Sequence, residues 1–179
     1  MKSVNEMIDD ILRREGGFVD HPADRGGPTR YGITRATLSA YLGREAQYAE
    51  VKNLEREVAR QIYQRNYFYQ PQIDQLPPAI QPFIFDCAVN HGPGRAIKFV
   101  QDVCNRAGYK PALSVDGTMG PDTRKGAEWA QGQLGESFLR ALLEERLNFY
   151  RRIVERDPSQ DVFLAGWTNR VNEFDEDMV

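Results

Sequence analysis

The sequence is poor in the residues that build metal sites and disulfide frameworks. Its 179 residues include two cysteines and two histidines, and these four side chains do not cluster along the chain. Zinc sites draw their ligands from cysteines and histidines at short, regular spacings, so we expect no metal and no cofactor. Cys87 and Cys104 each lie within an apolar-periodic segment. This placement favours two buried free thiols over a disulfide.

The sequence also lacks long hydrophobic runs and clusters of basic residues. The net charge is −3 and the pI is about 5.5. The arginines are scattered, so nothing indicates nucleic-acid binding. The first 17 residues are amphipathic and carry acidic side chains, unlike a signal peptide or a membrane anchor. We therefore expect a chain that is made in the cytoplasm without a signal peptide and has no stable membrane anchor.

Apolar residues recur at helical spacing over most of the chain. Hydrophobic residues make up 41% of the sequence, which is enough for a packed core. The spacing predicts helices over several ranges, with a further helix beginning at Pro121: 3–15, 35–42, 54–69, 79–91, 95–107, 137–156 and 160–171. Glycines and prolines between residues 16 and 33 predict a short β-ribbon. The expected fold is mainly α, with one small β-hairpin near the N-terminus.

The break Gly92-Pro93-Gly94 is the best candidate for a boundary between two regions. We expect a first region over residues 1–92 and a second helical region over residues 93–179, packed on the first.

Residues 15–34 concentrate the chemistry of the chain. Glu15 ends the first predicted helix, Asp24 follows nine residues later, and Thr29 lies five residues beyond Asp24. Glycine pairs after both acids allow positive φ and close approach of backbone. Cleavage of a glycosidic bond needs two carboxyl groups in unlike environments, one protonated and one ionised. The same residues are also compatible with a helix cap and a polar hairpin that have no chemistry.

Glu15 is the candidate for the protonated group. It follows Leu12 by three residues, so its side chain is expected to emerge beside the apolar stripe of the helix. A carboxyl at the edge of an apolar core favours its neutral form.

Five further residues are candidates for substrate binding. Tyr31 and Tyr67 carry rings that can stack on the apolar faces of sugars, although aromatic residues at such positions more often belong to the core. Asp86, Asn90 and His91 are polar exceptions in the most apolar predicted helix. They either brace neighbouring structure or line a groove. A single histidine of this kind is more often structural than catalytic.

Several motifs resemble glycoside hydrolase family 108, a family of phage and bacterial N-acetylmuramidases with a lysozyme-like fold. They are Glu15-Gly16-Gly17-Phe18, Asp24-x-Gly-Gly and Thr29-x-x-Gly32-Ile33-Thr34. The stretch 85–94, FDCAVNHGPG, resembles the central helix of the same family, which more usually has a small hydroxyl residue at the position of His91. Residues from about 94 onward resemble a predicted peptidoglycan-binding region.

The resemblance implies a muramidase that cleaves the β-1,4 bond between N-acetylmuramic acid and N-acetylglucosamine. Glu15 would be the general acid, Asp24 would orient and activate water, and Thr29 would help to hold that water. A phage or prophage endolysin is the expected type. Such a monomer would need a holin or a secretion apparatus to reach peptidoglycan in the periplasm. The alternatives are a lytic transglycosylase that uses Glu15 alone, and a non-catalytic module that binds peptidoglycan or belongs to a secretion system.

Overall fold

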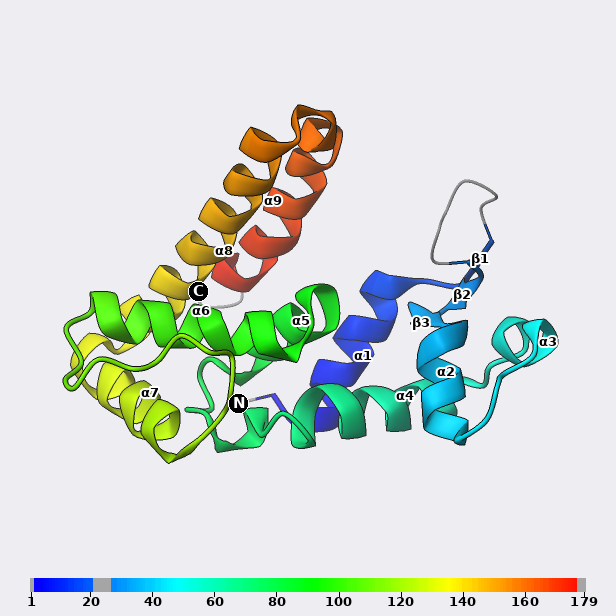
Figure 1. Ribbon diagram of the computed structural model, residues 1–179, viewed down its shortest axis with the longest axis horizontal. Coiled ribbons are helices and arrows are strands. Elements are labelled where there is room, and N and C mark those ends of the chain that lie inside the picture. Colours follow the sequence, from blue (N-terminus) through cyan, green and yellow to red (C-terminus); the bar gives the residue numbers. More distant parts are fainter. Residues whose placement is uncertain (1, 21–26, 177–179) are drawn as a thin grey trace. The chain divides into compact units, whose positions relative to one another are not determined.

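The computed structural model describes residues 2–20 and 27–176 and divides the chain into two compact units (Figure 1). Unit 1 is Met1–Gln70 and unit 2 is Pro71–Val179. The chain is mainly helical, with one small antiparallel sheet near the N-terminus, as predicted. Among the described residues, no helix is both long enough and apolar enough to cross a membrane. Asp24 lies outside the described residues, so its predicted role stays a prediction.

Unit 1 combines this sheet with short helices. Its elements are α1 (Val4–Glu15), β1 (Phe18–Val19), β2 (Thr29–Arg30), β3 (Ile33–Thr34), α2 (Arg35–Leu42), α3 (Tyr48–Lys52), α4 (Arg56–Tyr63) and the π-helix η1 (Gln64–Tyr69).

Helix α1 begins and ends at the residues that local chemistry dictates. Ser3 and Glu6 form a capping box, in which the Ser3 hydroxyl accepts from the Glu6 amide and the Glu6 carboxylate accepts from the Ser3 amide. Gly16, with φ of 74°, ends the helix just after Glu15. One face of α1 is buried and consists of Met7, Ile8, Ile11 and Leu12. This face fixes the rotation of the helix, and therefore the direction in which Glu15 leaves it.

Helix α4 packs against α1. Its buried residues are Ala59, Ile62 and Tyr63. At the exposed edge of the contact, Arg56 and Arg60 of α4 both pair with Asp9 of α1. The predicted single helix over 54–69 is therefore two elements, because the hydrogen bonding changes after Tyr63. The amide of Gln70 donates to the carbonyl of Arg65, five residues back, at 2.9 Å, which is π-helical spacing.

The sheet has the order β1-β2-β3, and both pairs of strands are antiparallel. Thr29 pairs with Thr34 and Arg30 pairs with Ile33, so Tyr31 and Gly32 alone connect β2 to β3. Both connecting residues have positive φ, 51° for Tyr31 and 75° for Gly32. This is the backbone of a type I′ turn, which matches the twist of a two-residue hairpin.

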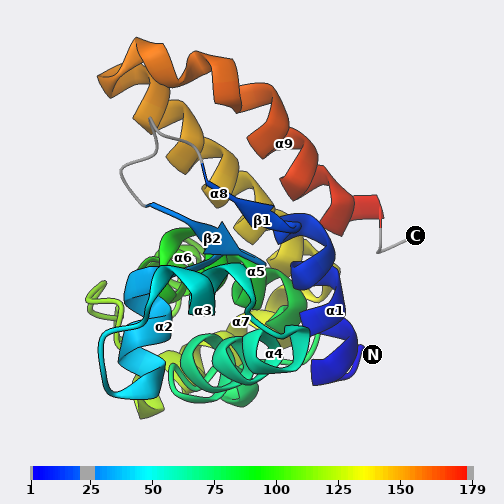
Figure 2. The ribbon, with the colours of Figure 1, turned by 90° about the vertical axis from the view of Figure 1, so that its right-hand side faces the viewer.

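Unit 2 is built from long helices. Its elements are the 3-10 helix η2 (Ile73–Gln75), α5 (Gln81–His91), α6 (Pro93–Arg106), α7 (Pro121–Leu134), α8 (Glu136–Arg156), the 3-10 helix η3 (Pro158–Gln160) and α9 (Asp161–Glu176). Helices α8 and α9 run side by side as a hairpin in both views (Figures 1 and 2). Helix α5 is buried along most of its length, and Cys87 and Cys104 are buried free thiols, as predicted.

The Gly92-Pro93 step, part of the candidate boundary, joins two helices in the structure. Pro93 occupies the first turn of α6, and Gly92, with φ of 86°, caps the end of α5 and the start of α6 at once. Proline at the first position of a helix is favourable because a backbone N–H at that position would have no partner within the helix.

Helix α3 (Tyr48–Lys52) was not predicted, because five residues are too few to show a helical period.

Candidate active site

Glu15 projects from the last turn of α1 into the tip of the β2–β3 hairpin. Its side chain is half-buried. The carboxyl group lies close to Gly32, where an added Cβ would lie 2.8 Å from Oε2 of Glu15 and 2.7 Å from the hydroxyl oxygen of Tyr63. Both distances are shorter than a carbon atom tolerates. Gly32 is therefore the residue that lets the hairpin approach the carboxyl group so closely.

Tyr63 completes this arrangement from α4. Its hydroxyl donates a hydrogen bond of 2.6 Å to the carbonyl oxygen of Tyr31, the residue beside Gly32 in the turn. A non-glycine residue rarely adopts the positive φ of Tyr31, and the bond from the buried Tyr63 holds that backbone in place. Three segments of unit 1 thus meet at Glu15: the end of α1, the hairpin turn and the end of α4.

The two predicted tyrosines of unit 1 belong to this neighbourhood. Tyr31 forms half of the turn, and Tyr67 of the π-helix places its ring 5.6 Å from the ring of Tyr63. Both Tyr31 and Tyr67 are half-buried, so each keeps some accessible ring surface. Substrate binding by these residues stays a prediction. Their positions beside the partners of Glu15 are consistent with it.

Thr29 and Arg30 lie on β2, just before the turn. Thr29 is half-buried and is paired in register with Val19 on one side and Thr34 on the other. Arg30 reaches to α3, where Nη1 donates to the carbonyl of Lys52 at 2.7 Å, and its guanidinium lies 5.3 Å from the centre of the Tyr31 ring. Side chains alternate along a strand. Thr29 and Arg30 therefore point to opposite faces of the sheet.

The three candidates of α5 lie in unit 2, and Asp86 is enclosed by arginines. Asp86 has no accessible surface and accepts from Arg146 of α8 at 2.8 Å and from Arg170 of α9 at 2.9 Å. Burial alone would raise the pKa of Asp86, but the two guanidinium groups outweigh it and hold that pKa below its usual range. A role for Asp86 in substrate binding stays a prediction, and the ion pairs alone account for a buried carboxylate here.

His91 and Asn90 continue the same polar cluster towards the surface. Nε2 of His91 accepts from Nε of Arg146 at 3.0 Å, and the amide of Asn90 donates to the hydroxyl of Tyr150 at 3.3 Å. Burial, together with the charge of Arg146, lowers the pKa of His91 to about 3. His91 is therefore neutral at neutral pH and acts as an acceptor. Binding by Asn90 and His91 also stays a prediction. Asn90 is exposed and His91 is half-buried.

Sequence reasoning missed two features around Glu15: the close approach of Gly32 and the hydrogen bond from Tyr63 to the turn. Gly32 was recognised as part of a glycine-rich stretch but not as a contact of the carboxyl group. In the sequence, Tyr63 has the pattern of a core aromatic residue. Its hydrogen bond to Tyr31 joins residues 32 positions apart, so only the folded structure reveals it. Among the described residues, no group of three or more histidines, cysteines or acids is arranged to hold a metal ion.

Comparisons with known proteins agree on the kind of chain this is. A model of the family described as glycosyl hydrolase 108 matches residues 8–92, and a model described as a predicted peptidoglycan domain matches residues 95–172. Among solved structures, SagA of Brucella abortus is similar at 32% identity with a TM-score of 0.78. The match covers 96% of this chain and 90% of that one. The comparison with curated proteins gave no match.

Replacing Gly32 with alanine tests the close approach. Gly32→Ala should lower the free energy of unfolding by about 2–4 kcal/mol, because a strained positive φ and a steric clash add together. Gly43 is the matched control, since it has φ of 70° and nothing within 4 Å of an added Cβ. Gly43→Ala should therefore cost only about 1 kcal/mol. Urea denaturation of both variants measures the difference, and equal losses would contradict the described contact.

The buried position of His91 predicts a dependence of stability on pH. The pKa of this group is about 3 in the folded chain and about 6.5 when unfolded. Below pH 6.5 the unfolded chain therefore binds a proton at His91, whereas the folded chain does not. The free energy of unfolding keeps its full value above that pH and falls as the pH drops towards 3. Between pH 7 and 4.5, wild type should lose about 2 kcal/mol more than His91→Gln.

Chemical denaturation at a series of pH values measures this difference. The carboxylates titrate in both proteins, so they cancel in the comparison. His21→Gln, which removes the other histidine of the chain, should retain the steep wild-type dependence. Parallel stability curves for wild type and His91→Gln would show that His91 is not held neutral.

Proposed function

Because the chain belongs to the glycosyl hydrolase 108 family, we propose that it is an N-acetylmuramidase. It is a lysozyme-like glycoside hydrolase that acts on peptidoglycan. The proposal adds the bond, which is the β-1,4 linkage between N-acetylmuramic acid and N-acetylglucosamine. The family matches divide the chain between residues 92 and 95, whereas its compact units divide at residues 70 and 71. Helix α5 thus belongs to the hydrolase match and to unit 2.

The observation that carries the proposal is the fixed position of Glu15. Glu15 leaves the end of a helix that is fixed by a buried face, and its carboxyl group lies close to Gly32 of the turn, which Tyr63 also approaches. A general acid must stay within hydrogen-bonding distance of the leaving oxygen, and misplacement by about 1 Å can cost a factor of about 10² in rate. The defined position of Glu15 suits this task, and its side chain keeps accessible surface through which a glycan can reach it.

In the proposed mechanism, Glu15 donates its proton to the oxygen of the bond that breaks. Asp24 acts as the base that takes a proton from water as that water attacks the anomeric carbon, and Thr29 helps to position the water. The ring surfaces of Tyr31 and Tyr67 would contact the sugars on either side. Glu15 ends the cycle deprotonated and Asp24 protonated, so Asp24 releases its proton to solvent and Glu15 takes one up before the next turnover.

The route to the substrate is a separate part of the proposal. We place the activity in the periplasm, after synthesis in the cytoplasm and release by a holin or a secretion apparatus. An endolysin of a phage or prophage would be used in this way. The chain would work as a monomer.

Substitution of Glu15 by glutamine should remove activity and leave the fold intact. Glutamine has the same shape but cannot donate the proton, so the rate of wall hydrolysis should fall by about 10²–10⁴-fold. The measurement is the clearing of Gram-negative cells with permeabilised outer membranes, with circular dichroism spectra of each protein. The control is Glu57→Gln, which changes an exposed carboxylate in the first turn of α4 and should clear cells as wild type does.

Full clearing by a folded Glu15→Gln protein would exclude Glu15 as the acid. A folded wild type that binds purified wall but releases no sugar would instead support the non-catalytic binding module.

The products should identify the second carboxyl group. If Asp24 activates water directly, the new reducing end should carry the inverted anomer, and Asp24→Asn should lower the rate by about 10²–10⁴-fold. The matched control is Asp20→Asn, because Asp20 lies four residues before Asp24 in the sequence and accepts only from the Tyr48 hydroxyl among the described residues. Product NMR reads the anomer and mass spectrometry reads the ends. Anhydro ends, lighter by one water, would instead identify a lytic transglycosylase.

A further inference from the structure

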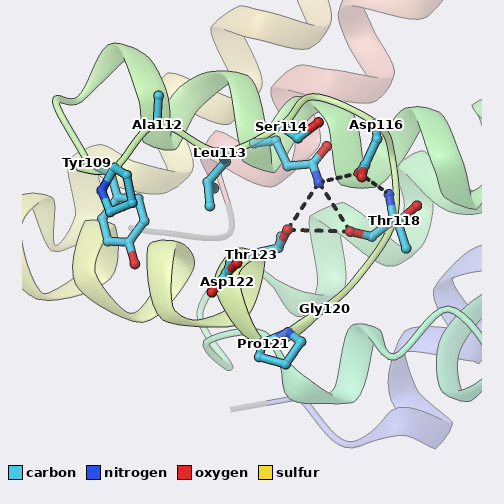
Figure 3. A pocket seen from close by; sticks show the side chains of 12 residues that line it. Tyr109, Ala112, Leu113, Ser114, Asp116, Thr118, Gly120, Pro121, Asp122 and Thr123 are labelled. Atoms are coloured by element: carbon cyan, nitrogen blue, oxygen red, sulfur yellow. Dashed lines mark hydrogen bonds between the residues drawn. The ribbon is translucent and has the colours of Figure 1, made fainter.

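Unit 2 contains a cavity that the proposed mechanism does not use. Its volume is about 260 Å³, and it lies between α6, the segment 107–120 and the first turn of α7 (Figure 3). Sites for small molecules usually enclose about 300–1,000 Å³. The cavity is therefore suited to a ligand of the size of a single sugar ring.

The wall of the cavity is fixed by two amide side chains of α6. Gln101 is buried. Its Nε2 donates to Oδ1 of Asp116 at 3.0 Å and to the carbonyl of Thr118 at 3.1 Å, while its Oε1 accepts from the amide of Gly117 at 2.9 Å. Asn105 bonds both the amide and the carbonyl of Leu113, at 2.7 and 2.9 Å. The segment thus has a defined shape without belonging to a helix or strand, and a ligand need not order it.

An aromatic ring forms one side of the cavity. Tyr109 lies against Gly126 of α7, where an added Cβ would be 3.4 Å from the ring and 2.9 Å from Leu113. On α7, the ring of Trp129 lies 5.4 Å from that of Tyr109. Because Gly126 has no side chain, Tyr109 and Leu113 can pack directly against α7. They give the cavity a firm apolar face beside its polar groups.

The polar groups of the cavity are acceptors and hydroxyls. Asp116 and Asp122 contribute carboxylates and Ser114 contributes a hydroxyl, whereas no lysine, arginine or histidine lines the cavity. Hydrogen bonds from the amide of Thr118 and from Gln101 lower the pKa of Asp116, which therefore stays ionised. Asp122 lies in the first turn of α7 and is exposed. Such a site accepts hydrogen bonds from a neutral ligand and repels an anionic one.

We propose that this cavity binds one N-acetylglucosamine unit of the glycan strand. The hydroxyls of that sugar would donate to Asp122 and to the free oxygen of Asp116, while its apolar face would lie on Tyr109. The other repeating sugar of peptidoglycan carries a lactyl group with a peptide that ends in carboxylates, and the two aspartates oppose it. The proposal rests on the proposed function for its ligand, because peptidoglycan is the polymer that offers this sugar.

Binding is best measured in the Glu15→Gln protein, which cannot consume its ligand. Titration with the N-acetylglucosamine trisaccharide, followed by ¹⁵N NMR, should shift the backbone signals of residues 109–123 in a saturable way. Asp122→Asn should weaken that binding by about fivefold or more, since the substitution removes a charged acceptor without changing its size. Asp161→Asn is the matched control, because it changes an exposed aspartate in the first turn of α9 and should bind as the parent does.

Three outcomes would overturn the assignment. The signals of residues 109–123 could fail to respond, Asp122→Asn could bind as tightly as the control, or a free stem peptide could displace the sugar from these residues. The last result would make the cavity a peptide subsite. Turnover by wild type is a separate measurement. If sugar binds here while no bond is cleaved, the enzymatic proposal fails alone, and cleavage without binding at these residues rejects the cavity alone.

Discussion

The approach of Gly32 to Glu15 is the contact on which the candidate active site depends. It requires that α1 end in the right direction, that β2 and β3 pair in one register, and that Tyr63 reach the carbonyl of Tyr31 from α4. A slip of one residue in the register would turn each strand over and remove the glycine from the turn. The packing of α4 on α1 and the hairpin register therefore cooperate to place one carboxyl group.

The local parts of this arrangement were predictable from the sequence, and the long-range parts were not. Ser3 with Glu6, Thr34 before α2 and Pro121 at the start of α7 mark helix ends through contacts within four residues, so the sequence alone reveals them. The hydrogen bond from Tyr63 to Tyr31 spans 32 residues, and no local pattern signals it. The glycine at position 32 could be predicted to turn, but its nearest neighbours are set by tertiary packing.

Asp86 shows why a polar residue in an apolar helix is ambiguous until the fold is known. The sequence allowed a brace or a groove, and the ion-pair partner that braces Asp86, Arg146, is 60 residues away. Both side chains are fully buried, and a second guanidinium from Arg170 compensates the carboxylate. Burial removes the hydration of both ions, so each needs a charged partner to offset that loss. The cluster joins α5, α8 and α9.

The two proposals assign one glycan site to each unit. In unit 1, a half-buried carboxyl group lies beside a strained turn, and a hydrogen bond from one buried hydroxyl holds that turn in place. In unit 2, the cavity that Asp116, Asp122 and Tyr109 line is the proposed site for a neutral sugar. Two such sites in one chain would raise the effective concentration of the glycan strand at each of them, so neither site would need a high affinity for a single sugar. Weak binding of each sugar would also suit turnover, because binding energy that is already present in the ground state does not accelerate the step that breaks the bond.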